Sequence, residues 1–260
     1  PGAEGFFEDG LLLCRDASTG LYSFVKQDGT AAFPASFAAA GAFSDGLALV
    51  RSADSGYLVL DTEGKTVAAL EAGADPAYYT VYGGDTVVMT NGTNYALYSI
   101  SKGAYLTDFL YNVVSEFHDG AAMVRQINRW GIIDTKAKLL TNPTYYYLSY
   151  MGEGLYAARS EDGSVAAVDA SGNIAYRTLT YIGGFNELRY GLSWHGMADG
   201  SLIFFKKNGG YFASLKNAEN PTLLSENVVR VTQDGTIKYI NLSTGRTLLS
   251  QAASFDLGSG

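Results

Sequence analysis

The sequence has little of the chemistry on which most catalytic and metal sites depend. It contains one cysteine and two histidines in 260 residues. A single cysteine excludes a disulfide within the chain, and Cys14, in the apolar run of residues 11–14, is expected to be a small buried residue. Two isolated histidines without a close carboxylate cluster predict no metal site. Phosphate, dinucleotide and calcium motifs are also missing, so we expect no cofactor.

Charge and long apolar runs are scarce as well. Only 17% of the residues are charged, the formal net charge is −8, and Lys and Arg form no basic stripe. Nucleic acid is therefore not an expected partner, because its binding depends on neutralising phosphates. The most apolar stretch, residues 31–43, is interrupted by Pro34, Ser36 and Gly41, so the sequence predicts no membrane span.

Aromatic residues, glycine and apolar residues are abundant instead. The chain contains 19 Tyr, 13 Phe and 31 Gly, and 47% of its residues are hydrophobic. Aromatic residues favour strands, and glycine supplies the backbone freedom that tight turns need. This composition predicts a globular, strand-rich protein with an ample core.

A glycine, or once an asparagine, opens a short apolar run at nearly constant spacing. The seven positions are Gly10, Gly46, Gly84, Gly120, Gly154, Gly191 and Asn227, separated by 36, 38, 36, 34, 37 and 36 residues. A fixed period in this range indicates a repeat architecture. Two short turns, most of them with glycine, recur in each unit and predict hairpins. The second unit predicts four strands, at residues 47–51, 57–61, 66–70 and 78–82.

Seven such units predict an all-β fold. We expect a seven-bladed β-propeller of four-stranded antiparallel blades, forming a single domain over residues 1–260. Residues 1–9 resemble the segment before the second unit and are expected to complete the last blade, which would remove exposed sheet edges. An open β superhelix or two β domains are the alternatives.

The fourth unit carries the most specific motif. Residues 117–125 read Phe-His-Asp-Gly-Ala-Ala-Met-Val-Arg, and residues 129–134 read Arg-Trp-Gly-Ile-Ile-Asp. This pattern resembles the WG-repeat (KWG) family of bacterial β-repeat proteins. The resemblance implies a non-catalytic scaffold for protein–protein or surface interactions, often exported or in the cell envelope. Because the chain begins at Pro1, a signal peptide or lipid anchor is expected to have been removed.

Several charged residues recur at equivalent positions of the repeat. Four arginines lie five residues after the unit's glycine, and three aspartates close the second strand before a turn. They are Arg15, Arg51, Arg125, Arg159, Asp61, Asp134 and Asp169. Residues repeated in this way are expected to hold the repeat together, the arginines by binding loop carbonyls or carboxylates of a neighbouring unit, and the aspartates by capping backbone N–H groups. A basic rim facing an anionic ligand is the alternative for the arginines.

Ligand-binding residues are expected where a unit departs from the repeat. In the sixth unit, Trp194 and His195 replace small or aliphatic residues and suggest a pocket mouth. Tyr145 and Tyr147 belong to a second aromatic group whose rings could stack on sugars or peptide side chains. The alternative for all four is packing inside the protein.

Catalysis is not expected. Ser193 and His195 share a strand face, but the segment is not a Gly-x-Ser-x-Gly elbow and has no acidic partner in sequence. The sequence thus predicts no catalytic residues and favours an interaction scaffold with a protein or glycan partner. A carbohydrate- or peptide-binding sensor is the second reading, and a hydrolase assembled across blades is the third.

Overall fold

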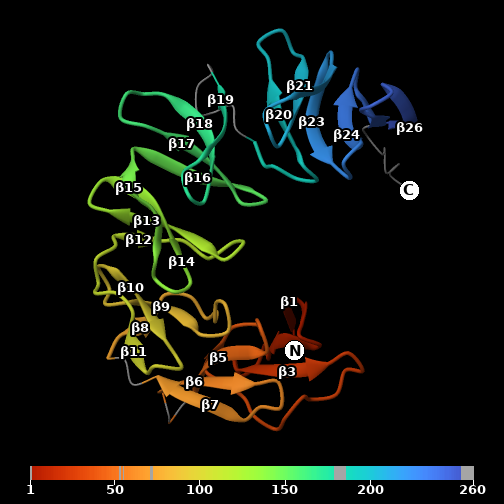
Figure 1. The fold of residues 1–260 in the computed structure, drawn as a ribbon. Helices are drawn as coiled ribbons and strands as arrows, with labels where there is room; N and C mark the ends of the chain where they lie inside the picture. The colour runs from red at the N-terminus through yellow and green to blue at the C-terminus, as the bar shows by residue number, and fades with distance from the viewer. Residues whose placement is uncertain (1, 53, 55, 71–72, 179–185, 253–260) are drawn as a thin grey trace. The chain divides into compact units, whose positions relative to one another are not determined.

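The computed structural model describes residues 2–52, 54, 56–70, 73–178 and 186–252. These residues form strands and turns, with no helix among them (Figure 1). The chain divides into two compact units, Pro1–Pro143 and Thr144–Gly260, where the sequence predicted one domain over residues 1–260. Each unit is described below by itself.

Four antiparallel sheets begin in the first unit. The first sheet is β1 (Gly2–Glu8), β2 (Leu11–Arg15) and β3 (Tyr22–Lys26). The second is β4 (Ala39–Ala40), β5 (Leu47–Ser52), β6 (Gly56–Asp61) and β7 (Thr66–Leu70). The third is β8 (Asp75–Pro76), β9 (Thr86–Thr90), β10 (Tyr95–Ser99) and β11 (Ala104–Tyr105). The fourth is β12 (Val113–Val114), β13 (Ala121–Gln126), β14 (Arg129–Asp134) and β15 (Leu139–Tyr145).

Three further sheets follow in the second unit. The fifth sheet is β16 (Tyr147–Gly152), β17 (Leu155–Arg159), β18 (Val165–Asp169) and β19 (Ile174–Thr178). The sixth is β20 (Leu192–Gly196), β21 (Leu202–Lys206) and β22 (Tyr211–Leu215). The seventh is β23 (Ala218–Leu223), β24 (Val228–Gln233), β25 (Thr236–Asn241) and β26 (Arg246–Ala252). In the described residues, five sheets thus have four strands and two have three.

The glycine that marks each repeat lies in a tight turn inside a sheet, not at the border between two sheets. Asp9 and Gly10 connect β1 to β2 with φ values of 49° and 78°. A two-residue turn with both φ positive matches the twist of antiparallel strands, so the strands before and after it pair directly. The strand that ends one sequence unit is therefore the first strand of the next sheet, and β4 pairs with β5 in this way.

This geometry changes the role of the N-terminal segment. β1 pairs with β2, with Glu8 opposite Leu11, while the seventh sheet has four strands of its own. Residues 2–8 are thus the first strand of the first sheet, which differs from the prediction that residues 1–9 complete the last blade. The short turn is the physical reason, because it holds β1 beside β2.

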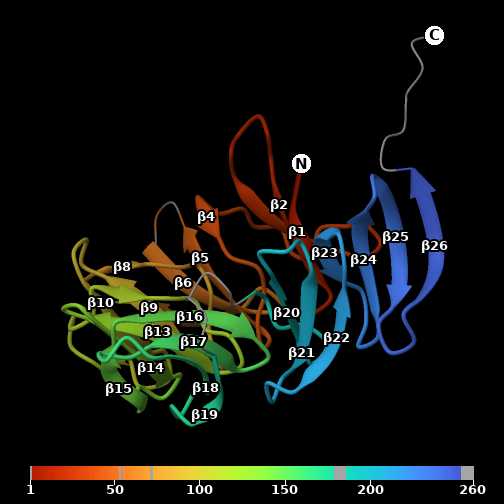
Figure 2. The ribbon, with the colours of Figure 1, turned by 90° about the horizontal axis from the view of Figure 1, so that it is seen from above.

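The central strands are buried on both faces. In β5, Ala48 and Val50 pack with the first sheet, whereas Leu49 packs with the third. Successive side chains of a strand point to opposite faces, so a continuous apolar run is needed when both faces are covered. In the second unit, the sixth and seventh sheets enclose a core that includes Phe204 and Val229. The strands of these two sheets lie side by side in Figures 1 and 2.

Candidate functional site

Three of the four repeated arginines, Arg15, Arg51 and Arg125, lie over aromatic rings of their own sheet. Arg15 pairs across its hairpin with the first residue of β3, and Arg51 and Arg125 pair with the second residue of β6 and β14. The distances from guanidinium carbon to ring centroid are 5.5 Å for Arg15 and Tyr22, 5.6 Å for Arg51 and Tyr57, and 5.7 Å for Arg125 and Trp130. The fourth, Arg159, pairs with Val165 within its hairpin and with Tyr147 on β16. Arg15, Arg51 and Arg125 thus contact rings within their own hairpins, whereas the sequence predicted contacts with a neighbouring unit.

Trp130 and Gly131 of the fourth sequence repeat have different structural roles. Trp130 receives Arg125, while Gly131 allows the next strand to approach. A Cβ atom on Gly131 would lie 2.5 Å from the carbonyl oxygen of Thr141 and 2.8 Å from the nitrogen of Pro143. Only a residue without a side chain fits this backbone contact.

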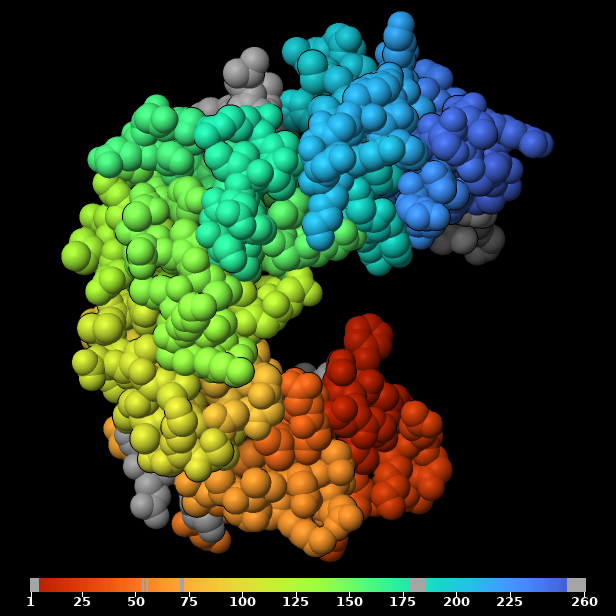
Figure 3. All heavy atoms as spheres, in the orientation of Figure 1, coloured from red at the N-terminus to blue at the C-terminus, as the bar shows by residue number. Residues whose placement is uncertain are grey.

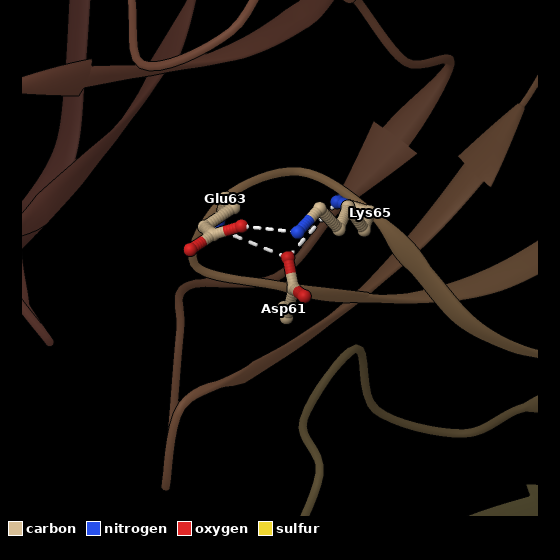
Figure 4. A network of polar contacts seen from close by, with 3 residues as sticks. All are labelled: Asp61, Glu63 and Lys65. Atoms are coloured by element: carbon tan, nitrogen blue, oxygen red, sulfur yellow. Dashed lines mark hydrogen bonds and ion pairs between the residues drawn. The ribbon is translucent and has the colours of Figure 1, made fainter.

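The repeated aspartates each bind two backbone N–H groups of the turn that follows. The carboxylate oxygen Oδ1 accepts from the backbone N–H groups of the residues two and four positions later in the chain. The N···O distances are 3.0 and 2.9 Å at Asp61, 2.9 and 2.8 Å at Asp134, and 2.9 and 2.9 Å at Asp169. At Asp61 the turn also carries an ion pair between Lys65 and Glu63 at 2.5 Å (Figure 4). Both partners are exposed, so this pair adds little stability. The aspartates cap turns, as the sequence suggested.

Trp194 lines a groove of about 760 Å³ in the second unit. Its ring is partly buried and packs against the core between the sixth and seventh sheets, which lie against each other in Figure 3. We call this feature the Trp194 groove, and its main lining residues are Trp194, Met197, Asn217, Glu219, Pro221 and Asp234. The groove lies in the sixth sequence repeat, where Trp194 departs from the repeat pattern.

The wall of the groove opposite Trp194 is irregular and acidic. Asn217 and Asn220 have φ values of 49° and 50°, and the pairing of β23 shifts between Glu219 and Thr222. Such a bulge turns side chains away from the regular strand direction. Among the described residues, the charged side chains that line the groove are Glu219 and Asp234. Lys238 lies outside the lining and approaches Asp234 at 3.6 Å.

The neighbours of Trp194 on β20 have other roles. The Ser193 side chain is buried, and its hydroxyl donates to the backbone oxygen of Asn186 at 3.0 Å. The Asn186 amide donates to the backbone oxygen of Trp194 at 2.9 Å, which anchors the strand that carries the ring. His195 is partly buried, pairs with Ile203 on β21, and points to the opposite face from Trp194 because side chains alternate along a strand.

The two predicted tyrosines lie elsewhere in the second unit. Tyr145 ends β15 and is half-buried, and burial together with the charge of Asp169 raises the pKa of its phenol. Tyr147 begins β16, is 40% exposed, and lines a small pocket of about 250 Å³ beside Ser149. The structure therefore places Trp194 and Tyr147 in separate pockets and does not gather the four predicted ligand residues into one site.

No group of three or more His, Cys, Asp or Glu side chains with the arrangement of a metal site occurs in the described part of the chain. Over the same residues, no helix has the length and apolar character needed to cross a membrane. Cys14 is buried and forms no disulfide.

Comparison with known proteins places this geometry in a fold. The chain is similar to a eukaryotic initiation factor, with 13% identity over 95% of this chain and 76% of that chain and a TM-score of 0.58. It is also similar to BamB from Moraxella catarrhalis, with 14% identity over 95% of this chain and 86% of that chain and a TM-score of 0.50. Both are β-propeller proteins, and at this identity the likeness shows the fold alone.

The sequence comparisons are more restricted. No curated protein sequence matches the chain. The model of the WG-containing repeat family matches residues 130–163, which begin at Trp130 and include the turn at Asp134. Within the matched residues, Trp130 receives the Arg125 guanidinium, Gly131 allows the close strand approach and Asp134 caps its turn. The chain is an all-β protein of seven antiparallel sheets with a β-propeller-like fold, and the match supports its assignment to the WG-repeat family.

Proposed function

We propose that this chain is a non-catalytic binding module that holds a basic segment of a protein partner in the Trp194 groove. One observation carries the proposal. Arg15, Arg51, Arg125 and the repeated aspartates make contacts within their own hairpins, whereas Trp194 lines a groove at a place where the repeat is broken. Side chains that are not needed to maintain the repeat are available for recognition.

The chemistry of the groove favours a cationic side chain. The face of an indole ring attracts an ammonium or guanidinium group, and Glu219 and Asp234 add two carboxylates to the same lining. The net charge of −8 also favours the approach of a basic partner. A Lys or Arg side chain between the ring and the carboxylates is therefore the occupant that the groove suits best.

The setting of Ser193 supports a non-catalytic role. Its hydroxyl is buried and donates to a backbone carbonyl, so it is engaged in holding Asn186 and not in activating a reaction with His195. We further propose, from the family resemblance, that the protein acts outside the cytoplasm or in the cell envelope. A signal sequence encoded upstream of Pro1 would support this placement, and a cytosolic location of the full-length protein would contradict it.

Peptide arrays with basic, neutral and acidic 12-residue peptides would test the function. We expect preferential binding of basic peptides, weakened by salt, and a loss of about tenfold in affinity for Trp194→Ala, because a cation–π contact in a partly buried site contributes about 1 kcal/mol or more. Glu219→Gln should weaken binding as well.

Tyr211→Ala is the matched control, because Tyr211 is 63% exposed on β22 and does not belong to the groove. It should bind as the parent does. Equal affinity for acidic peptides, or basic-peptide binding that survives Trp194→Ala, would count against the proposal.

A further inference from the structure

A carboxylate before the repeat glycine connects one repeat to the next. The side chain of Asp9 accepts a hydrogen bond from the backbone N–H of Gly46 at 2.8 Å, 37 residues later. The side chain of Glu153 accepts one from the N–H of Gly191 at 2.8 Å, 38 residues later. The same contact, one repeat apart, thus occurs in both units. We call it the turn latch.

The residue that should make the next latch is Tyr190. It occupies the place of Asp9 and Glu153, directly before the glycine, and has a φ of 54°. Asp and Asn tolerate this left-handed conformation, whereas a bulky aromatic residue is rare there and costs about 1 kcal/mol. Asn227 stands where the next glycine is expected, and its N–H is bound by the hydroxyl of Ser225 at 3.3 Å. The latch between the sixth and seventh repeats is therefore replaced.

A pocket of about 750 Å³ lies at this place. We call it the Tyr190 pocket, and its main lining residues are Asp169, Tyr190, Lys206, Phe212, Glu226 and Asn227. The Tyr190 side chain is 43% exposed, and the guanidinium of Arg189 lies 5.1 Å from the centre of its ring. A strained, exposed aromatic side chain thus lines a pocket in the position where four sister repeats carry an acidic residue, Asp9, Asp45, Asp119 and Glu153.

The lining charges balance. Lys206 and Lys207 are opposed by Asp169 and Glu226 in the described lining, so a ligand with net charge gains no advantage there. Lys207 also donates to the backbone oxygen of Glu153, and Asp169 binds its own turn, which fixes both groups. The pocket offers hydrogen-bond donors, hydrogen-bond acceptors and an aromatic face. This combination suits a neutral ligand that has many hydroxyl groups and an apolar C–H face.

We propose that the Tyr190 pocket binds a neutral carbohydrate, with a sugar ring stacked on Tyr190. The proposal goes beyond the function proposed above, because it concerns another pocket and another class of ligand. The aromatic ring supplies the stacking surface, and the lysines, carboxylates and Asn227 supply partners for the sugar hydroxyls.

The test uses cellohexaose, chitohexaose and maltohexaose as probes, with binding measured by saturation-transfer NMR and titration calorimetry on the whole chain. We expect at least one of them to bind. Tyr190→Phe keeps the ring and should bind within about threefold of the parent, whereas Tyr190→Ala and Tyr190→Asp should lose about tenfold or more.

Tyr190→Asp has a second expected result. It restores the acidic residue of the sister repeats, so it should raise the melting temperature while it removes carbohydrate binding. Asp9→Ala is the matched control, because it removes a latch in the first unit and should lower the melting temperature without changing carbohydrate binding.

Three results would overturn the proposal: none of the hexasaccharides binds, binding survives Tyr190→Ala, or binding depends on Trp194 instead. Trp194→Ala should leave carbohydrate binding intact and reduce only the binding of basic peptides. The two proposals therefore fail separately.

Discussion

At the scale of single residues, Arg51 and Arg159 form a natural pair for measuring the arginine–aromatic contact. Both are exposed and occupy equivalent strand positions, but Arg51 lies over the ring of Tyr57, whereas Arg159 pairs with Val165 within its hairpin and with Tyr147 on β16. We expect Arg51→Ala to lower the free energy of unfolding by about 0.5–1 kcal/mol, and Arg159→Ala by less than about half of that.

Urea denaturation would give both values. The Tyr57 hydroxyl also donates to Asp75, so Tyr57→Leu alone would remove that hydrogen bond as well. A double-mutant cycle of Arg51→Ala and Tyr57→Leu would isolate the coupling energy between the two side chains. Equal losses at Arg51 and Arg159 would show that the aromatic partner contributes nothing.

Gly131→Ala tests the close approach of two strands. The added Cβ would meet the Thr141 carbonyl at 2.5 Å, so we expect a loss of about 1–3 kcal/mol from the shift of backbone that must follow. Gly196→Ala is the control, because the nearest atom to its Cβ would be a Leu202 methyl at 3.9 Å. Thermal unfolding of both variants measures the difference, and similar melting temperatures would refute the steric account.

The sequence predicted that these repeated residues are structural, but not how. Spacing placed Arg51 and Arg125 at equivalent positions, yet it does not report cross-strand register, so the aromatic partner on the same hairpin was missed in favour of a neighbouring unit. The register follows from the turn length, and Tyr57 and Trp130 at the start of each second strand were the available signal.

At the scale of the turn, three exposed aspartates predict an acid-sensitive fold. The pKa values of Asp28, Asp162 and Asp199 lie below the ordinary 3.8. Each carboxylate accepts a hydrogen bond from the hydroxyl of the residue two positions later, and the backbone N–H of that residue lowers the pKa further; the donors are Thr30, Ser164 and Ser201. A lowered folded-state pKa stabilises the protein above the unfolded pKa, and this stabilisation is lost as pH falls through the folded value.

We therefore expect the urea midpoint to fall as the pH drops below about 5, and to go on falling as the folded-state pKa values below 3.8 are passed. The triple variant Asp28→Asn, Asp162→Asn, Asp199→Asn keeps a neutral acceptor in each turn and should show a smaller decline. An identical decline in both proteins would show that other carboxylates control the acid response.

Strands with a predicted turn at each end were located correctly from the sequence. In the second repeat of the sequence, the predicted strands at residues 47–51, 57–61 and 66–70 match β5, β6 and β7 within one residue. The fourth run, residues 78–82, was wrong, because the observed strand is the two-residue β8 at Asp75–Pro76. Short edge strands carry too little hydrophobic pattern to be located from sequence.

At the scale of the whole molecule, the N-terminal strand provides a test of how the sheets are assembled. Deleting residues 2–8 should lower the free energy of unfolding by several kcal/mol, because it exposes the edge of β2 and the core around Leu11 and Leu13. Phe6 does not contribute to this loss, since its side chain is 85% exposed.

Hydrogen exchange would locate the damage. We expect lost protection in β2 and unchanged protection in β26. Lost protection in β26 would instead favour the earlier prediction that this segment completes the last blade.

The seven-sheet fold could be predicted because the repeat is read directly from glycine spacing. The pockets could not, because each depends on side chains from separate sheets that only folding brings together, such as Trp194 and Glu219, or Tyr190 and Glu226. Tyr190 left a signal in the sequence all the same, as the aromatic residue in a place where Asp9, Asp45, Asp119 and Glu153 are acidic.

The turn that places the repeat glycine inside a sheet also determines how such a chain can be lengthened or shortened. If a gene were duplicated or recombined at the glycine, each crossover would separate the two strands of a hairpin such as β4 and β5. A crossover in the segment between the last strand of one sheet and the first strand of the next, such as between β15 and β16, would transfer whole sheets. Recombination that exchanges whole sheets between such proteins is therefore expected about one strand before the repeat glycine, and not at the glycine itself.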